Sequence, residues 1–422
     1  MDKKTVTCRK NPIIPLRGVC DPHMHVFDNR VWLHASHDAD PESTYFCMRD
    51  WQVWSSADCV EWQLESVVHP EGFYMGPSEK CWAVDCEERN GKYYFYFSDG
   101  GQRTGVGVGD SPAGPFREVL GKPLLDGTVT PTLEYDPCVF KDDDGEYYLV
   151  FGGPKWCGGA GYYIARLNED MVSFAEAPRP LEVNHPADDK ASLNKFNGKY
   201  YLTYGGYYAI SDNVYGPYKF MGNTGSCTDH TSYFEWNGQI FNAFSFTEYY
   251  GIYRSSGMCY THIRDNGELV VDPLILEYGV GQYDSNWMRL EAEWFMRGVN
   301  VKKVENKDSY GFSVSCTEQA ILTYPKVRNL SDKRGLYIRS SCVGTGGEIE
   351  LREGSETGRL IGSVRLKETG PRFQWQYTCR AIIHFPEPLD DVTDVCLVLK
   401  PDPGSELRLD YIHFYPEAID NP

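Results

Sequence analysis

The sequence predicts an all-β protein of two domains, and three observations lead to this prediction. Tyr, Phe and Trp make up 14% of the 422 residues, and Gly and Pro, with 41 and 25 copies, are frequent enough to mark many turns. No long stretch keeps the 3.6-residue apolar period of an amphipathic helix, so strands joined by turns are expected. The chain is also longer than one hydrophobic core usually supports.

A recurring hairpin sequence predicts that the first domain is a five-bladed β-propeller. Each copy joins a turn pair, usually Asn-Gly or Asp-Gly, to an aromatic or β-branched strand. The copies begin at Asn90, Asp144, Asn197 and Asn237, and a degenerate fifth copy begins at Asn29. The clear copies are spaced by about 40 to 50 residues, which is typical of propeller blades.

The blades are expected in chain order after a polar lead-in over residues 1–16. The turn at residues 111–116 closes the second blade, because its Pro and Gly residues supply the dihedral angles of a turn. The expected blade segments are 18–58, 82–116, 135–151, 188–218 and 228–276.

A change of composition at residues 279–284 is typical of a linker. From Leu290 to Phe414 the chain alternates short strands with turns, which predicts a β-sandwich of the jelly-roll type. The sequence therefore predicts a propeller over residues 1–286 and a sandwich over residues 287–422.

Charge and cysteine content limit the partners and the compartment. The formal net charge of −19 argues against nucleic acid and anionic membrane, because both bind a basic face. No apolar run reaches transmembrane length, and residues 1–7 lead into no apolar signal segment. The fourteen cysteines lack the paired spacing of a metal site, which favours reduced thiols and a cytoplasmic location. A secreted protein without its signal peptide is the alternative. The sequence gives no indication of oligomeric state.

Three acidic residues stand at the start of the innermost strand of three blades. Asp21 and Asp136 each precede a proline, and Asp189 precedes the hairpin of the fourth blade. Because the first strands of propeller blades line the central channel, we expect the three carboxylates to meet on the axis. Repulsion and desolvation would separate their pKa values and yield one protonated acid and one ionised base. Hydrolysis of a glycosidic bond requires such a pair.

Structural interpretations compete with the catalytic one. Asp before Pro is a common turn opener, so Asp21 or Asp136 taken alone is compatible with a structural role, and only their recurrence favours catalysis. Asp142 to Asp144 lie in a hairpin turn and are expected to be a solvated charge cluster. His23 and His25 have no third metal ligand at a fitting spacing, so we expect them to line a pocket or to pack.

Taken together, these motifs resemble glycoside hydrolase family 43, whose members are five-bladed propellers with an inverting site on the axis. The resemblance covers roughly residues 10–285 in the family's order. The matching segments are Cys20-Asp21-Pro22-His23, Ser36-His37-Asp38, Tyr135-Asp136-Pro137, Phe140 to Gly145, Asn197 to Tyr201, Thr228-Asp229-His230 and Tyr253-Arg254-Ser255.

The resemblance implies roles for individual residues. It makes Asp21 the general base and Asp136 the carboxylate that tunes the pKa of the acid and orients it. Arg254 resembles the arginine that holds the base and the sugar, and His230 matches a histidine that contacts an axial calcium ion or ordered water. The alternatives are a core histidine for His230 and a surface ion pair for Arg254.

The fourth blade departs from the family pattern. The family has a glutamate as general acid nine residues before the hairpin glycine, and this sequence has Asp189 there, preceded by Asp188. Aspartate is one methylene shorter, and a general acid must reach the leaving oxygen. Catalysis therefore requires a shift of Asp189 toward the substrate, Asp188 in its place, or another acid.

The C-terminal domain resembles carbohydrate-binding module family 6. Glu291-Ala292-Glu293 and Leu409-Asp410-Tyr411 carry this resemblance, which implies that Glu291, Glu293 and Asp410 bind a structural calcium ion. Trp375 and Tyr377 lie where the family has a sugar-stacking tryptophan, and the position of a second aromatic falls near Cys316. The domain therefore either binds sugar or only braces the propeller or forms a wall of the active site.

The sequence thus predicts an inverting exo-glycosidase that takes part in xylan degradation. It would release α-L-arabinofuranose or β-D-xylose from short plant-cell-wall oligosaccharides, without a cofactor for the chemistry. The alternative is a catalytically impaired propeller that binds carbohydrate, which the aspartate at position 189 motivates. The expected substrate-binding residues are Arg254, His230, Asp188, His37 and Trp375.

Overall fold

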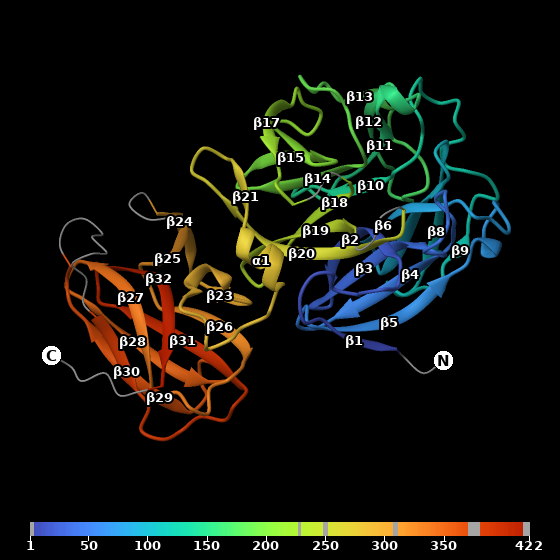
Figure 1. The fold of residues 1–422 in the computed structure, drawn as a ribbon. Helices are drawn as coiled ribbons and strands as arrows, with labels where there is room; N and C mark the ends of the chain where they lie inside the picture. Colours follow the sequence, from blue (N-terminus) through green and yellow to red (C-terminus); the bar gives the residue numbers. More distant parts are fainter. Residues whose placement is uncertain (1–3, 227–228, 248–251, 307–310, 370–379, 417–422) are drawn as a thin grey trace. The chain divides into compact units, whose positions relative to one another are not determined.

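The computed structural model describes residues 4–226, 229–247, 252–306, 311–369 and 380–416 (Figure 1). The chain divides into two compact units. The first comprises Met1–Phe234, Phe241–Cys259 and Val270–Val280, and the second comprises Glu235–Ile240, Tyr260–Leu269 and Gly281–Pro422. The boundary predicted near residue 286 falls inside the second of these units.

Five antiparallel sheets follow one another along the chain and form the blades of a propeller, which confirms the predicted fold class. The first blade holds β2 (Val19–Phe27), β3 (Arg30–Asp38), β4 (Met48–Ser56) and β5 (Glu61–Val68), with β1 (Thr5–Thr7) paired to β5. The second holds β6 (Cys81–Arg89), β7 (Lys92–Asp99), β8 (Arg103–Gly109) and β9 (Arg117–Glu118).

The remaining blades repeat this order of four strands. The third holds β10 (Cys138–Lys141), β11 (Tyr147–Gly153), β12 (Gly161–Arg166) and β13 (Arg179–Pro180). The fourth holds β14 (Ala191–Phe196), β15 (Lys199–Tyr204), β16 (Tyr207–Ser211) and β17 (Lys219–Asn223). The fifth holds β18 (Thr231–Trp236), β19 (Gln239–Thr247), β20 (Arg254–Ile263) and β21 (Leu269–Val271). Short helices η1 (Pro70–Gly72), η2 (Lys155–Cys157) and α1 (Pro273–Tyr278) lie between strands.

Tight turns join the first two strands of the blades, as the Asn-Gly pairs predict. Asn90 and Gly91 have φ angles of 55° and 74°, and Asn197 and Gly198 have φ angles of 51° and 75°. Positive φ at both central residues gives a turn whose twist matches the twist of the strands that it joins. The repeated turn thus fixes where each inner strand ends and the second strand of the blade begins.

Aromatic side chains fill the space between neighbouring blades. The ring of Trp51 on β4 lies 5.0 Å from that of Phe97 on β7, and the ring of Phe95 lies 4.7 Å from that of Phe116. All four belong to one buried cluster. Such packing contributes both burial of apolar area and ring contacts, and it holds the inner strands in place around the axis.

The N-terminal segment closes the ring of blades. The Asn11 side chain donates from Nδ2 to the carbonyls of Met258 and Leu276, at 2.9 and 3.0 Å, and accepts the Met258 N–H at 2.8 Å. The Ile13 N–H donates to the carbonyl of Ser256 at 2.8 Å. Because Ser256 and Met258 lie on β20, these bonds tie the chain just before the first blade to the fifth.

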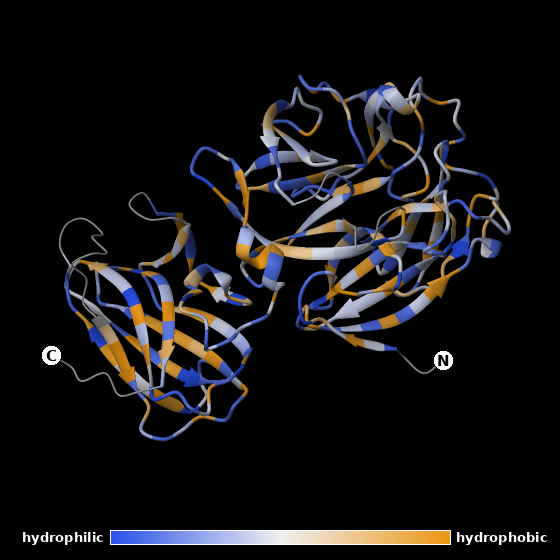
Figure 2. Cartoon of the chain, in the orientation of Figure 1, coloured by the Kyte–Doolittle hydropathy of each residue, from blue (hydrophilic) through white to orange (hydrophobic). Residues whose placement is uncertain are grey.

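Two antiparallel sheets form a β-sandwich in the second unit. One has the order β24 (Lys302–Glu305), β25 (Phe312–Cys316), β32 (Glu406–Tyr415), β27 (Gly335–Val343) and β30 (Arg380–His384), with β22 (Leu290–Glu291) beside β32 and η3 (Ala292–Trp294) after β22. The other has the order β23 (Arg297–Val299), β26 (Ala320–Val327), β31 (Thr393–Pro401), β28 (Gly347–Glu353) and β29 (Leu360–Leu366). Figure 2 shows hydrophobic and hydrophilic residues alternating along these strands, which is the pattern of a sheet with one buried face.

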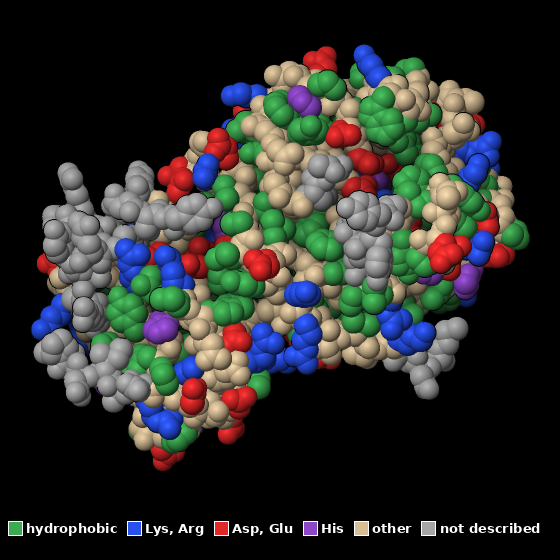
Figure 3. Space-filling view, in the orientation of Figure 1, with side chains coloured by type: hydrophobic (Ala, Val, Ile, Leu, Met, Phe, Trp, Pro, Cys, Tyr) green, Lys and Arg blue, Asp and Glu red, His purple; other side chains and the backbone are tan. Residues whose placement is uncertain are grey.

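The described residues show mixed charge on the surface and mostly buried free thiols. Basic and acidic side chains are interspersed on the face drawn in Figure 3. Twelve cysteines lie among the described residues as free thiols, and all of them except Cys157 are buried. No helix in the described part of the chain is long and apolar enough to cross a membrane.

Candidate active site

A cavity of about 340 Å³ in the propeller brings the predicted acids together. Asp21 comes from β2, Asp136 and Asp189 precede β10 and β14, and His230 and Arg254 stand at the starts of β18 and β20. All five line the cavity, so the inner ends of four blades supply its polar groups. The other lining residues are Phe46, Met48, Trp82, Ala83, Tyr135, Trp156, Cys157 and Asp229.

The same backbone arrangement presents two of the three acids. Asp21 and Asp136 have φ angles of 48° and 55°, in the left-handed region that residues other than glycine rarely adopt. The Asp21 N–H donates to Ser245 Oγ at 3.2 Å, and the Asp136 N–H donates to Ser98 Oγ at 2.9 Å. In both cases the serine belongs to the preceding blade, counted around the ring. The neighbouring blade therefore stabilises a strained conformation, as is common at functional sites.

Arg254 neutralises three carboxylates at once. Its Nη1 lies 2.6 Å from Asp21 Oδ1 and 3.0 Å from Asp229 Oδ2, and its Nε lies 3.2 Å from Asp38 Oδ2. The Arg254 N–H also donates to Asp38 Oδ2, at 2.8 Å. Arg254 is buried, so the alternative of an ordinary surface ion pair is wrong. Planar, charge-assisted pairs of this kind fix the position and the orientation of a carboxylate.

His230 lies between the acids. Its Nε2 is 2.9 Å from Asp189 Oδ1 and 4.0 Å from Asp136 Oδ2, and its Nδ1 is 3.7 Å from Asp21 Oδ1. Burial acts to lower the pKa of His230, but the charges of Asp21 and Asp189 outweigh burial and raise this pKa to about 10. The ring is therefore an imidazolium at neutral pH and joins the carboxylates by charge.

Asp136 is the acid whose pKa moves toward neutrality. Burial raises the pKa of Asp136 to about 7, with His230 opposing this shift and Asp189 adding to it. By contrast, the pKa of Asp229 falls well below its ordinary value, because Arg254 and His230 outweigh its burial. The pKa values of two neighbouring carboxylates, Asp136 and Asp229, are thus shifted in opposite directions, as acid–base chemistry at one site requires.

Asp189, and not Asp188, faces the cavity. Asp188 is half-buried and is not among the residues that line it. The Tyr162 hydroxyl holds this loop, because it donates to the Asp189 carbonyl at 2.6 Å and accepts the Asp188 N–H at 2.9 Å. Asp189 and Asp21 contact opposite nitrogens of the His230 ring, so they lie within the roughly 9.5 Å upper limit of an inverting pair.

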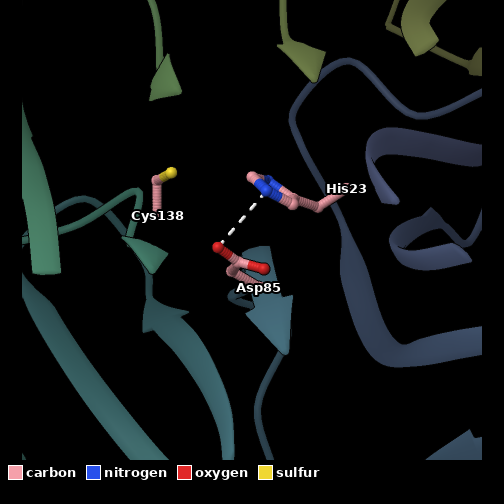
Figure 4. A group of neighbouring side chains, drawn as sticks. All are labelled: His23, Asp85 and Cys138. Carbon is pink, nitrogen blue, oxygen red and sulfur yellow. Dashed lines mark ion pairs between the residues drawn. The ribbon is translucent and has the colours of Figure 1, made fainter. Parts of the chain in front are cut away.

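A buried charge network that the sequence did not reveal adjoins the acids. Lys190 is 1% exposed, donates from Nζ to the Val84 carbonyl at 2.8 Å and contacts His23 Nδ1 at 3.1 Å. His23 Nε2 lies 3.3 Å from Asp85 Oδ2, and Figure 4 marks this ion pair with a dashed line. His25 Nε2 contacts the other oxygen of Asp85 at 2.7 Å. The two histidines therefore pack in a network of charges, in keeping with the packing role expected for them.

His23, Asp85 and Cys138 have ligand atoms within 4.8 Å of one another, yet they do not fit a metal ion. Burial lowers the pKa of His23 well below its ordinary value, so the ring is neutral. A neutral ring that accepts from Lys190 at Nδ1 carries its proton on Nε2 and donates it to Asp85. That assignment leaves no His23 lone pair for a metal, and Lys190 already supplies the positive charge.

The calcium sites implied by the resemblances are not supported by the residues present. Calcium takes six to eight oxygen ligands, mostly carboxylates and carbonyls. In the sandwich, Asp410 Oδ2 lies 2.6 Å from Arg339 Nη1, and Glu291 Oε1 lies 2.8 Å from Arg289 Nε. The carboxylate of Glu293 accepts the N–H of Phe312 at 3.3 Å. Guanidinium groups thus hold the carboxylates of Glu291 and Asp410 in place of a metal ion.

His230 does not fit a calcium site either. Its Nε2 is within hydrogen-bond distance of Asp189, and the nearby carboxylates of Asp21 and Asp229 pair with Arg254. An imidazolium flanked by paired carboxylates offers little to an ion that prefers oxygen.

His37, another predicted site residue, falls outside the cavity. His37 Nδ1 contacts Asp50 Oδ1 at 2.8 Å, and His37 is not among the lining residues. Trp375 lies outside the described residues. The aromatic wall of Phe46, Trp82 and Trp156 was missed, because these residues come from a loop, from strand β6 and from helix η2, and no periodic signal links them. Phe46 lies over the Arg254 guanidinium, with 4.9 Å between ring centre and Cζ.

Comparison with known proteins identifies the family. Residues 9–219 match the model of glycosyl hydrolases family 43. The chain belongs to this family. A beta-xylosidase of Xylanibacter ruminicola is 33% identical over 263 residues, which cover 50% of this chain and 80% of that protein. An arabinoxylan arabinofuranohydrolase of Paenibacillus polymyxa is 26% identical over 437 residues, which cover 87% of this chain and 68% of that protein.

Solved structures of family 43 extend the likeness to both units. A beta-xylosidase/alpha-arabinofuranosidase from a compost microbial metagenome, in a calcium-free complex with xylotriose, is 28% identical with a TM-score of 0.56, over 63% of this chain and 98% of that one. An arabinoxylan arabinofuranohydrolase of Bacillus subtilis is 22% identical with a TM-score of 0.57, over 98% of this chain and 99% of that one. The second likeness shows that the fold is shared along the whole chain.

The raised pKa of Asp136 predicts a characteristic dependence of stability on pH. The folded state holds a proton on Asp136 up to about pH 7, whereas an unfolded aspartate loses it near pH 3.9. This group therefore favours the folded state below about pH 4, and its contribution is lost as the pH rises to about 7. Asp136→Asn, which cannot ionise, should gain melting temperature relative to wild type as the pH rises from about 4 to about 7, while activity falls about 100-fold or more.

Asp142→Asn is the matched control in the same blade. Burial raises the pKa of Asp142, but hydrogen bonds from Lys195 and Tyr200 outweigh it and lower this pKa below its ordinary value. That variant should lose melting temperature relative to wild type as the pH rises. Parallel curves for wild type and Asp136→Asn would contradict the raised pKa of Asp136.

The Lys190 network predicts a second pH effect. The charge of Lys190 lowers the pKa of Asp136, so Lys190→Met should raise this pKa above about 7 and shift the alkaline limb of kcat/KM to higher pH. The measurement is kcat/KM from pH 4 to pH 10. The control is Lys195→Met, since Lys195 pairs with Asp142 at 2.6 Å and does not line the cavity. If folded Lys190→Met keeps the alkaline limb of kcat/KM at the wild-type pH, Lys190 does not lower the pKa of Asp136 in the working enzyme.

Proposed function

We propose that this family 43 enzyme is an inverting exo-glycoside hydrolase that releases terminal α-L-arabinofuranose or β-D-xylose from short plant-cell-wall oligosaccharides. One observation carries the proposal: Asp21 and Asp189 contact opposite sides of His230 in one cavity. A separation that leaves room for water between sugar and base distinguishes an inverting pair from a retaining one.

Asp21 is suited to act as the general base. Both of its oxygens face Arg254, Oδ1 at 2.6 Å from Nη1 and Oδ2 at 3.3 Å from Nη2, so the carboxylate is held in one orientation. It would take a proton from water as the water oxygen bonds to the anomeric carbon. The bond from that carbon to the leaving oxygen breaks in the same step.

Asp189 is suited to deliver a proton to the leaving oxygen. It is the more exposed of the three acids and lies on the Nε2 side of His230 together with Asp136. Repulsion between Asp136 and Asp189 contributes to the raised pKa of Asp136, so Asp136 holds a proton close to Asp189 up to about pH 7. A proton held so near suits an acid that must deliver one to the leaving oxygen.

The sugar specificity rests on the cavity wall and on the relatives. Phe46, Trp82 and Trp156 present flat apolar rings, which suit the C–H faces of a sugar. The relatives named above act on xylosides and arabinofuranosides by their names, and so does a xylosidase/arabinosidase of Bacteroides ovatus that is 30% identical over 266 residues. A cytoplasmic location, where imported short oligomers would be the substrate, belongs to the same proposal.

The proposal predicts the behaviour of three variants. Asp21→Asn should lose about 100-fold or more of kcat on 4-nitrophenyl α-L-arabinofuranoside or β-D-xyloside, because the base is removed. Asp189→Asn should lose as much on an oligosaccharide but less on the aryl glycoside, whose good leaving group needs little acid. The matched control is Asp188→Asn, which should stay within a few fold of wild type because Asp188 does not line the cavity.

Initial rates and the anomeric form of the first product, followed by proton NMR, provide the readout. Inversion with the loss pattern above agrees with the proposal. Retention of configuration, or full activity of Asp21→Asn on both substrate types, would exclude it.

A further inference from the structure

A second cavity, of about 600 Å³, opens beside the first in the same unit. One aromatic side chain, Trp156, lines both cavities, so they meet at its indole ring. Trp156 belongs to the short helix η2 and is 78% exposed, the most exposed of the described tryptophans. The remaining principal lining residues are Tyr162, Leu181, Val183, His185 and Ala187.

We propose that this second cavity binds the leaving-group saccharide, that is, the part of the oligosaccharide that remains after the terminal sugar has been released. The inference rests on the proposed function and specifies its substrate. The ligand class is a neutral pentose oligosaccharide, and Trp156 is its stacking platform.

The position of the cavity relative to the acid supports this assignment. Residues 185–187 line the cavity and run directly into Asp188 and Asp189. Tyr162, another lining residue, holds the carbonyl of Asp189 through its hydroxyl at 2.6 Å. A general acid must contact the leaving oxygen, so the leaving saccharide extends from the side of the site where the acid lies. The second cavity is on that side, and Asp21 lies across His230 from it.

The chemistry of the walls suits a sugar. Leu181, Val183 and Ala187 give an apolar lining, and Tyr162 and His185 add aromatic rings. His185 is fixed against Phe220, with ring centres 4.0 Å apart and planes 8° from parallel. Saccharides bind to such surfaces with a C–H face against a ring and their hydroxyls toward polar groups or water. Isolated exposed aromatic residues are ordinary, so the assignment depends on the place of Trp156 between two cavities and not on its exposure alone.

The position of the acids indicates how the substrate is divided. The first cavity, of about 340 Å³, holds the acids, and the second, of about 600 Å³, does not. We therefore assign the single released sugar to the first cavity and the rest of the oligosaccharide to the second. Short oligosaccharides should accordingly bind better than simple glycosides of the same pentose.

A binding measurement tests the site without depending on turnover. Asp21→Asn, which removes the base, is titrated calorimetrically with xylotriose and with xylose, alone and combined with Trp156→Ala. In Asp21→Asn, xylotriose should bind at least tenfold more tightly than xylose, because only the trisaccharide reaches the second cavity. Adding Trp156→Ala should bring this affinity ratio close to one, since loss of a stacking ring weakens mainly the longer ligand.

Phe46→Ala is the matched control, since Phe46 lines only the first cavity. It should weaken both ligands alike and leave the ratio unchanged. Trp156→Phe should keep most of the ratio, because it retains an aromatic ring. A ratio that Trp156→Ala changes by less than twofold would overturn the proposal, and so would failure of folded Asp21→Asn to bind either sugar.

Turnover by Trp156→Ala distinguishes this proposal from the proposed function. The kcat/KM ratio of xylotriose to 4-nitrophenyl β-D-xyloside should fall about tenfold, chiefly through KM for xylotriose. If the wild type cleaves neither substrate but the affinity ratio behaves as described, the hydrolytic function fails and the saccharide site stands.

Discussion

The guanidinium of Arg254 is the group on which the site depends, because it lies where several buried carboxylates would otherwise repel one another. It pairs with Asp21, Asp38 and Asp229, at nearest distances of 2.6, 3.2 and 3.0 Å. Desolvating so many charges is unfavourable unless cations and hydrogen bonds compensate, so removal of this one cation would destabilise the fold and the site together. The His230 imidazolium serves Asp189 and Asp136 in the same way. Division of the acids between two cations separates the Asp21–Arg254 pair from Asp136, whose pKa burial raises to about 7.

The geometry of the blades delivers these groups to one place. Asp21 and Asp136 adopt left-handed backbone angles, and serines of the preceding blades, Ser245 and Ser98, accept their N–H groups. A strained conformation persists only where its surroundings determine it, and here the ring of blades provides them. Asp189 is held differently, by Tyr162, a lining residue of the second cavity. A residue of the surface assigned to the leaving group therefore also holds the acid.

The sequence predicted those features of the fold and the site that depend on a local or repeated sequence pattern. The Asn-Gly turns predict the blades, and the spacing before Gly198 finds Asp189, since both depend on short-range geometry. Long-range contacts could not be predicted from the sequence. Lys190 contacts Val84 and His23, which are more than 100 residues away in the chain, and no local pattern predicts such contacts. The arginines that pair with Glu291 and Asp410 escaped prediction for the same reason, because they are not part of the motif that implies a calcium ion.

The central claim is that a protonated His230 joins the base and the acid, and the ionisation of its ring tests this most directly. Nitrogen-15 NMR of protein labelled on histidine side chains, recorded from pH 5 to pH 11, reports the charge of each imidazole. The account predicts that the His230 ring stays charged to about pH 10, because Asp21 and Asp189 outweigh its burial, and that Asp189→Asn lowers this titration point. A His230 ring that is neutral at pH 7 in the wild type would contradict the account.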